Sequence, residues 1–309
     1  MRDVAKLTLT FLTLVAVAAL TLARASDERS VYLANTLSQL EHDLNNRLGV
    51  FVLDTATGRL FGYRADERFA TASAFKVLLA GVVLARAEAG DFALDDTVSI
   101  EGVEIQPHSP LIDKLDGSSP VSLATLCQAA VELSDNTATN LLLAKLGGPA
   151  GFTAQLRELG DATTRIDRWE IELNTNLPGD DRDTSSPAAM ATTLASLLDG
   201  STLTDEHTEL LGNWLRGSKT GLSRLRAGLP NDWDVGDKTG TGQNGAVNDV
   251  AVIWPPNDAP PVIVAVLMDG GTADFATHNA AHAKIGQAVA AWLAQSEREQ
   301  QLSHSTGMR

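Results

Sequence analysis

The sequence predicts an α+β fold of two domains: an antiparallel sheet built from both chain ends and flanked by helices, with an inserted all-helical domain. Strand-like segments occur before residue 64 and after residue 231, and the segments between them have helical periodicity. The last two strand segments are rich in β-branched residues. Hydrophobic residues make up 44% of the 309-residue chain, which allows a large core. This order favours one sheet that draws on both termini.

The elements follow in chain order. A helix is expected over residues 28–46, because Leu33, Leu37, Leu40 and Leu44 recur at three- and four-residue spacing. Two strands, 49–53 and 60–63, are joined by a turn over 54–58, and a buried helix then runs over 77–89 and ends at Gly90. Further helices are predicted over 122–132, 137–146, 151–159, 188–198, 205–215 and 276–295, and further strands over 232–241, 246–255 and 262–268.

The domain boundaries follow from this pattern. We expect an α/β domain from residues 26–66 and 217–300, and a helical domain from residues 67–216 that carries the nucleophile. The helical domain includes a long polar segment with weak periodicity, residues 161–187, called the polar loop below. Long loops of this kind are uncommon in compact domains and are often functional.

The N-terminus has the pattern of a signal peptide. Arg2 and Lys6 precede an apolar run over residues 7–22, and Ala23-Arg24-Ala25 fits the small-x-small cleavage rule. A membrane anchor is the alternative, but the run is short for a full span and no second span follows. We therefore expect cleavage near residue 25 and a periplasmic or secreted protein.

Charge and cysteine content limit the possible partners. The formal net charge is −15 and no basic cluster occurs, which argues against nucleic acid and anionic membrane surfaces as partners. Cys127 is the only cysteine, so it cannot form an intrachain disulfide, and a buried, unreactive thiol is expected. No feature of the sequence indicates a partner chain, and we expect a monomer.

A Ser-x-x-Lys pair opens the apolar helix. Residues three apart lie on one helix face, so Lys76 Nζ is expected to reach Ser73 Oγ. A serine hydroxyl needs a base to become a nucleophile, and burial can lower a lysine pKa enough to supply one. A surface lysine one turn from an ordinary serine is the alternative.

Two further motifs lie later in the chain. Ser134-Asp135-Asn136 separates two predicted helices, where it either faces a cleft or caps the second helix. Lys-Thr-Gly occurs twice. The copy at Lys219 is expected to be a turn, whereas the copy at Lys238 ends a strand and can line a cleft from a sheet edge.

The polar loop contains Arg168-Trp169-Glu170-Ile171-Glu172-Leu173-Asn174. Arg168 and Asp183 are expected to pair across its neck and hold it closed. The alternative is that the two glutamates of this segment are ordinary solvent-exposed residues.

Taken together, the motifs at Ser73, Ser134, Glu170 and Lys238 resemble those of class A serine β-lactamases. The resemblance spans nearly the whole chain after residue 25 and includes the segments 135–142, 177–180, 182–184, 187–190 and 226–230. It implies the β-lactamase/transpeptidase-like fold and hydrolysis of penicillins, and of some cephalosporins, with resulting β-lactam resistance. It implies no metal and no cofactor.

The resemblance also implies residue roles. Ser73 would form the acyl-enzyme, Ser134 would relay a proton to the lactam nitrogen, and Glu170 with Asn174 would activate the hydrolytic water. Either Lys76 or Glu170 would be the base for acylation. The residues implied in substrate binding are Asn136, Asn174, Arg224, Lys238, Thr239, Gly240, Thr241 and His108.

Several positions depart from relatives. Ala80 stands where some members have a cysteine that pairs with the one matching Cys127. Ala72 excludes the disulfide found beside the serine in some carbapenem-hydrolysing members, which lowers the expectation of carbapenem turnover. Ile171 replaces a common proline, and His108 stands where an aromatic residue is common.

Motifs for other chemistries are weak in this sequence. No Gly-x-Ser-x-Gly elbow occurs, and His278 and His282 have a metal-like spacing without a third ligand, which favours ordinary surface positions on the last helix. A penicillin-binding D-Ala-D-Ala peptidase and a non-hydrolysing β-lactam-binding module are the alternative functions. Glu170 with Asn174 argues against the peptidase.

Overall fold

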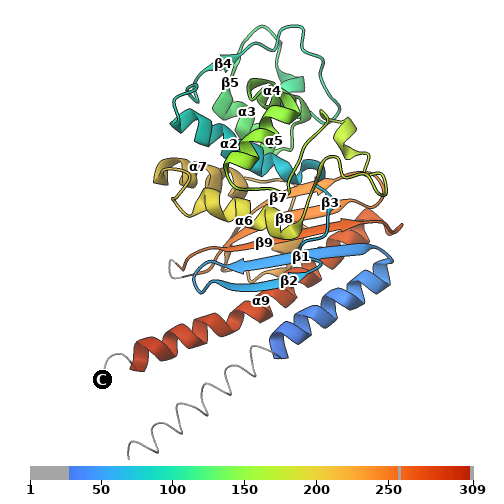
Figure 1. Ribbon diagram of the computed structural model, residues 1–309, viewed down its shortest axis with the longest axis vertical. Coiled ribbons are helices and arrows are strands. Elements are labelled where there is room, and N and C mark those ends of the chain that lie inside the picture. Colours follow the sequence, from blue (N-terminus) through green and yellow to red (C-terminus); the bar gives the residue numbers. More distant parts are fainter. Residues whose placement is uncertain (1–27, 257–258, 307–309) are drawn as a thin grey trace, which may run out of the picture.

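The computed structural model describes residues 28–256 and 259–306. Its centre is an antiparallel five-stranded sheet with the strand order β2-β1-β9-β8-β7 (Figure 1). The strands are β1 (Arg47–Asp54), β2 (Arg59–Tyr63), β7 (Asp234–Thr241), β8 (Val247–Trp254) and β9 (Val262–Asp269). Because β1 lies between β2 and β9, both ends of the chain build this sheet, as the sequence predicts.

Helices cover both faces of the sheet. The N-terminal helix (residues 28–44) and α9 lie on one side, and α2 to α7 lie on the other (Figure 1). The helices are α2 (Lys76–Glu88), α3 (Leu123–Glu132), α4 (Asn136–Lys145), α5 (Gly148–Glu158), α6 (Pro187–Leu198), α7 (Asp205–Arg216), α8 (Leu225–Gly228) and α9 (Phe275–Thr306). The α+β class with inserted helices is therefore confirmed.

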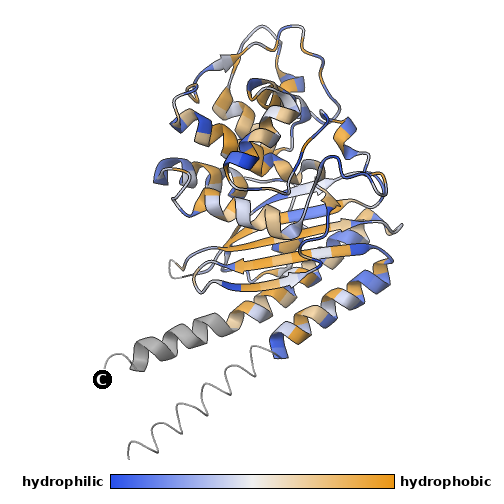
Figure 2. Ribbon diagram, viewed as in Figure 1, coloured by the Kyte–Doolittle hydropathy of each residue, from blue (hydrophilic) through white to orange (hydrophobic). Residues whose placement is uncertain are grey.

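The central strands β1 and β9 are largely apolar along their length, because each face of the sheet packs on helices (Figure 2). On one face, Leu33 and Leu37 of the N-terminal helix meet Ile285 and Trp292 of α9 in a single buried cluster with the strands. On the other face, a second cluster joins the sheet to the helical part of the chain. The sheet thus has a core on each side.

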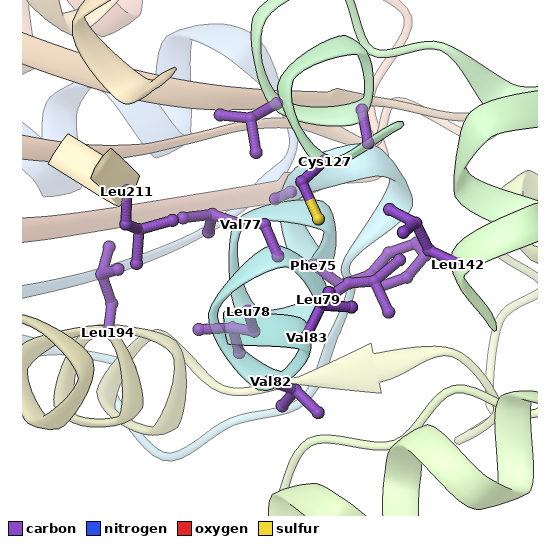
Figure 3. Close-up of a cluster of buried hydrophobic side chains, with 14 of the residues drawn as sticks. Phe75, Val77, Leu78, Leu79, Val82, Val83, Cys127, Leu142, Leu194 and Leu211 are labelled. Atoms are coloured by element: carbon purple, nitrogen blue, oxygen red, sulfur yellow. The ribbon is translucent and has the colours of Figure 1, made fainter. Parts of the chain in front are cut away.

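Helix α2 lies at the centre of the second core (Figure 3). Its residues from Lys76 to Leu84 are all buried, as expected of a helix that is apolar all round. A methyl group on Gly81 would come within 2.4 Å of Leu197 Cδ1, so the glycine lets α6 pack closely. The helix ends before Gly90, which has φ of +84°.

Short elements that the sequence did not reveal tie the loops to the core. They are the 3₁₀ turns η1 (Ala72–Phe75), η2 (Ile112–Lys114) and η3 (Glu172–Asn174), and the short strands β3 (Phe69–Ala70), β4 (Thr97–Val98), β5 (Val121–Ser122) and β6 (Thr184–Ser185). β3 pairs with β6, and β4 pairs with β5. The β3–β6 pair joins the end of the polar loop to the segment just before Ser73.

The expectation of surface positions for His278 and His282 is wrong. Both side chains are buried, with 2% and 0% of their surface exposed. His282 Nε2 lies 3.2 Å from the carbonyl oxygen of Val247. Burial is the main reason that the pKa of His282 lies well below its usual value, so this imidazole is neutral inside the core.

The expected signal peptide, residues 1–25, lies outside the described residues. Within residues 28–256 and 259–306, no helix combines the length and the apolar character needed to cross a membrane.

Candidate active site

Ser73 lies in η1, the 3₁₀ turn that runs directly into α2. Its side chain is partly exposed, whereas Ala72, Ala74 and Phe75 are buried. Gly240 of β7 packs on this turn: a methyl group there would come within 2.6 Å of the Thr71 carbonyl oxygen. Only glycine lets the strand lie this close to the serine.

Lys76 follows the serine by one turn and is fully buried. Its ammonium donates to Asn136 Oδ1 (2.6 Å) and to the Ser134 carbonyl oxygen (3.0 Å), and pairs with Glu170 Oε1 at 2.9 Å. These contacts replace the expected one to Ser73 Oγ, because carboxylate, amide and carbonyl oxygens are better acceptors for an ammonium than a hydroxyl. Burial lowers the pKa of Lys76, and the charge of Glu170 opposes that shift.

Glu170 is the polar-loop residue that reaches the serine. Its Oε1 lies 3.4 Å from Ser73 Oγ, and its Oε2 accepts a hydrogen bond of 2.6 Å from Asn174 Nδ2. The backbone of Glu170 is held by Asn140, which accepts from its N–H and donates to its carbonyl, both at 2.9 Å. The peptide bond between Glu170 and Ile171 is cis. The carboxylate is thus fixed on both sides between Ser73, Lys76 and Asn174.

The predicted ion pair at the loop neck is present. Arg168 Nε lies 2.5 Å from Asp183 Oδ2, and the side chain of Asp183 is fully buried. Asp183 Oδ1 also accepts from the backbone N–H groups of Asp167 (2.7 Å) and Arg168 (3.0 Å). The carboxylate therefore holds both ends of the loop together.

Ser134, Asp135 and Asn136 combine both roles considered for them. Asp135 is the N-cap of α4 and accepts from the Ala138 N–H at 2.8 Å. Ser134 has φ of +59°, a left-handed conformation that turns the chain just before the cap. Ser134 and Asn136 both line the cleft. The cap thus fixes the two residues that flank it.

Lys238 approaches from β7. Its Nζ donates to Ser134 Oγ over 3.1 Å and to the Thr239 carbonyl oxygen over 2.7 Å. Its side chain is fully buried, and burial, aided by the charges of Lys76 and Arg224, places its pKa well below the usual value. The buried site beside Ser134 thus disfavours the charged form of Lys238.

Arg224 lies beneath the exposed end of β7 with 1% of its surface exposed. Its guanidinium donates to Thr241 Oγ1 (2.7 Å), to the Gly240 carbonyl oxygen (3.0 Å) and to Asn279 Oδ1 (3.2 Å). Burial lowers the pKa of Arg224 from its ordinary value. A guanidinium nevertheless stays protonated at neutral pH. The guanidinium of Arg224 is thus fixed beside the Thr241 hydroxyl.

These residues surround a cleft of about 440 Å³. Its walls are formed by Ser73, His108, Ser134, Asn136, Asn174, Thr220, Arg224, Thr239, Thr241 and Phe275. Lys76, Glu170 and Lys238 are buried behind this lining.

Two lining residues, Thr220 and Phe275, were not predicted. Thr220 belongs to the first Lys-Thr-Gly copy, which lies in a loop with bends at Lys219 and Thr220, and its Oγ1 accepts from Thr239 Oγ1 at 2.6 Å. The second occurrence of Lys-Thr-Gly in the sequence is the pattern that could have identified Thr220 as a cleft residue. Phe275 starts α9 and carries no motif.

The comparisons with known proteins agree with this geometry. The model of the β-lactamase enzyme family matches residues 32–293. β-Lactamase SME-1 of Serratia marcescens is 44% identical over 247 residues, which cover 79% of this chain and 84% of that protein. β-Lactamase AST-1 of Nocardia asteroides is 43% identical and covers 89% of this chain and 92% of that protein. The chain belongs to the class A serine β-lactamases.

Solved structures give the same result for the fold. The class A β-lactamase described as the last common ancestor of Gram-negative bacteria superposes with a TM-score of 0.81 at 52% identity, covering 84% of this chain and 98% of that one. A β-lactamase of Desulfarculus baarsii superposes with a TM-score of 0.82 at 45% identity, covering 85% and 98%. The protein is thus a hydrolase that acts on β-lactams and supports β-lactam resistance. This result sets aside the peptidase and the non-hydrolysing module.

Metal-binding clusters and the cysteine are two other places where chemistry could occur. No cluster of three or more histidine, cysteine, aspartate or glutamate side chains suited to a metal occurs within residues 28–256 and 259–306. Cys127 is a free, buried thiol, and burial raises its pKa far above the usual value. The thiolate is therefore not accessible at neutral pH.

Proposed function

We propose that Ser73 is the nucleophile of this β-lactamase. In acylation, Ser73 Oγ forms a bond to the lactam carbonyl carbon, the lactam C–N bond breaks, and the proton of the serine ends on the lactam nitrogen. Ser134 delivers that proton, and the hydrogen bond from Lys238 orients its hydroxyl. The backbone N–H groups of Ser73 and Thr241 stabilise the oxyanion. Losing one such donor costs about 3 kcal/mol.

Glu170 is the proposed proton acceptor from Ser73. The observation that carries this assignment is the triangle of Ser73 Oγ, Glu170 Oε1 and Lys76 Nζ, in which the carboxylate oxygen lies 3.4 Å from the hydroxyl and 2.9 Å from the ammonium. Lys76 lies between this carboxylate and Ser134, whose carbonyl oxygen it contacts at 3.0 Å. Its ammonium gives a proton to Ser134 as Ser134 protonates the lactam nitrogen, and it takes the proton of Ser73 from Glu170, so that the carboxylate is ionised again before deacylation. Lys76 also orients Asn136.

Deacylation uses the same carboxylate. Glu170 and Asn174 position a water, and Glu170 takes its proton as the water oxygen attacks the ester carbonyl. The ester C–O bond breaks and the proton returns to Ser73. The hydrogen bond of 2.6 Å from Asn174 to Glu170 supports this pairing, because it fixes the face of the carboxylate turned to Ser73.

The substrate carboxylate is proposed to bind at the β7 end of the cleft. Lys238 and the hydroxyls of Thr239 and Thr241 contact it, and Arg224 supports them from below. Asn136 and His108 are neighbours in the lining of the cleft, since the Asn136 N–H donates to the His108 carbonyl oxygen over 3.1 Å, and they are proposed to contact the acylamino side of the lactam. Gly240 keeps the strand close enough for these contacts.

Penicillins and some cephalosporins are the proposed substrates. Some relatives are named for wider activity: an imipenem-hydrolysing β-lactamase of Enterobacter cloacae is 45% identical over 74% of this chain. Ala72 leaves this chain without a cysteine beside the nucleophile, and we expect low carbapenem turnover on that basis.

The domain division, export and oligomeric state belong to the same proposal. We assign residues 26–66 and 217–300 to the α/β domain, and residues 67–216 to the helical domain. We assign the N-terminal 25 residues to a cleaved signal peptide, so the mature protein is periplasmic or secreted. We also propose that the mature protein is a monomer. Sequence pattern supports these assignments, and the cleft between the domains then lies between α2 and β7.

Glu170→Ala tests the mechanism. Removing the carboxylate removes the charge that holds the pKa of Lys76 up, so Lys76 loses its proton more readily and acylation continues. Deacylation has no base, and the variant should accumulate a penicilloyl adduct on Ser73 in intact-protein mass spectrometry. Ser73→Ala is the control and should form no adduct. Fast turnover by Glu170→Ala, or an adduct on Ser73→Ala, contradicts the assignment.

A further inference from the structure

Phe275 is an exposed aromatic residue at the mouth of the cleft. It begins α9, lines the cleft, and leaves 54% of its surface accessible. No catalytic step above uses it. A large apolar side chain on a cleft wall is the kind of group that contacts a ligand.

The neighbours of Phe275 fix which part of the substrate it meets. The guanidinium carbon of Arg224 lies 5.3 Å from the centre of the Phe275 ring. Asn279, one helical turn after Phe275, accepts from Arg224 Nε at 3.2 Å. The ring therefore lies beside Arg224, one of the residues proposed for the substrate carboxylate.

The covalent structure of the substrate completes the argument. In cephalosporins the carboxylate is carried by C4 of the six-membered ring, and the variable ring substituent is carried by the adjacent C3. A carboxylate bound over Thr239 and Thr241 thus directs the C3 substituent toward Phe275 and Thr220. In penicillins the corresponding position carries only methyl groups, which reach less far.

We propose that Phe275 forms the wall of a subsite for the C3 substituent of cephalosporins, and that this enzyme favours substrates with a flat, uncharged aromatic group there. The proposal rests on the assignment of Arg224, Thr239 and Thr241 to the substrate carboxylate. Arg224 lies within reach of the phenyl ring, so a cationic C3 group would meet a like charge as well as the aromatic ring. An uncharged ring gains the stacking contact without that repulsion.

The contact is made before the lactam opens and persists through acylation. It should therefore act on KM and kcat/KM, with kcat nearly unchanged. The test compares three substrates: a penicillin, a cephalosporin with a methyl group at C3, and a chromogenic cephalosporin with a styryl group at C3. The styryl group is not expelled on hydrolysis, so the rates report the lactam chemistry alone.

The variants are Phe275→Ala, Phe275→Tyr and Leu222→Ala. Leu222 is the matched control, because it is an exposed apolar residue (59%) that does not line the cleft. For Phe275→Ala we expect kcat/KM on the styryl substrate to fall by about threefold to tenfold, the range of an aromatic contact, through KM. The penicillin and the C3-methyl cephalosporin should change by less than about twofold. Phe275→Tyr should keep the styryl preference, and Leu222→Ala should leave all three substrates unchanged.

Two results would overturn the proposal. An equal loss of kcat/KM on all three substrates would show that Phe275 acts by positioning Arg224, since every substrate carries the carboxylate. Unchanged kcat/KM on the styryl substrate would show that the ring contacts no substituent. The adduct experiment with Glu170→Ala and Ser73→Ala tests the roles of Ser73 and Glu170 separately, so a failure of that mechanism is a distinct result.

Discussion

Replacing Arg168 with alanine should loosen the polar loop and slow deacylation. Asp183 is fully buried, and Arg168 is the partner of its Oδ2 at 2.5 Å, whereas Oδ1 keeps its two backbone donors. Removing one partner of a buried ion pair costs about 3–5 kcal/mol, and the 17% exposure of the Arg168 side chain favours the lower end. A loss of about 3 kcal/mol corresponds to a melting temperature lower by about 6–12 °C for a protein of this size.

The assay combines thermal unfolding with single-turnover hydrolysis of a penicillin. Arg165→Ala is the matched control, because its ion pair with Asp167 lies in the same loop but is 42% exposed on the arginine side. Such a pair contributes about 0–1 kcal/mol. If Arg168→Ala melts at the same temperature as Arg165→Ala and deacylates at the same rate, the neck pair does not hold Glu170 in place.

A double-mutant cycle isolates the pair itself. Arg168→Ala with Asp183→Ala should be destabilised by less than the sum of the two single variants, because the second substitution removes the charge that the first one leaves unpaired. Additive losses would show that the two side chains act independently.

Two other predictions concern the sheet. Burial, with the nearby charge of Asp237, raises the pKa of the Asp249 carboxyl to about 8, above its value in the unfolded chain, so the folded protein holds a proton that the unfolded chain releases. Stability should therefore fall as pH rises from about 4 to about 8, and Asp249→Asn should flatten that slope in urea unfolding, whereas an unchanged slope would refute it. Gly240→Ala places a methyl group 2.6 Å from the Thr71 carbonyl oxygen and 2.9 Å from the Ala74 nitrogen. It should lower kcat/KM by more than about tenfold while costing about 1–3 kcal/mol of stability, and wild-type activity would contradict the close packing of β7 on η1.

The parts of the site that sequence could predict are those with a local pattern. Ser73 and Ser134 are each marked by a short motif at a helix start, and the structure brings both to one cleft. The two-ended sheet followed from where the β-branched segments lie. The Arg168–Asp183 pair followed from opposite charges at the two ends of one polar loop.

The remaining features depend on which groups compete for a contact in three dimensions. The spacing of Ser73 and Lys76 predicts a hydrogen bond between Lys76 Nζ and Ser73 Oγ. Glu170 and Asn136, which lie far away in the sequence, are stronger acceptors and bind the ammonium in its place. His282 was expected at the surface, yet its neutral imidazole packs against β8. Phe275 carries no local signal at all, because its position depends on the start of α9 packing beside Arg224.

The strand order has a consequence for synthesis of the chain. β1 obtains its inner neighbour only from β9, and Leu53 pairs with Ile263, roughly 200 residues later. At about 5–20 residues per second, a ribosome needs on the order of 10–40 seconds to make the intervening chain. During that time β1 has β2 as its sheet partner and an open edge on the other side. The sheet is therefore completed only after β9 has emerged, and the nascent chain is exposed to aggregation through the open edge of β1 for the same interval.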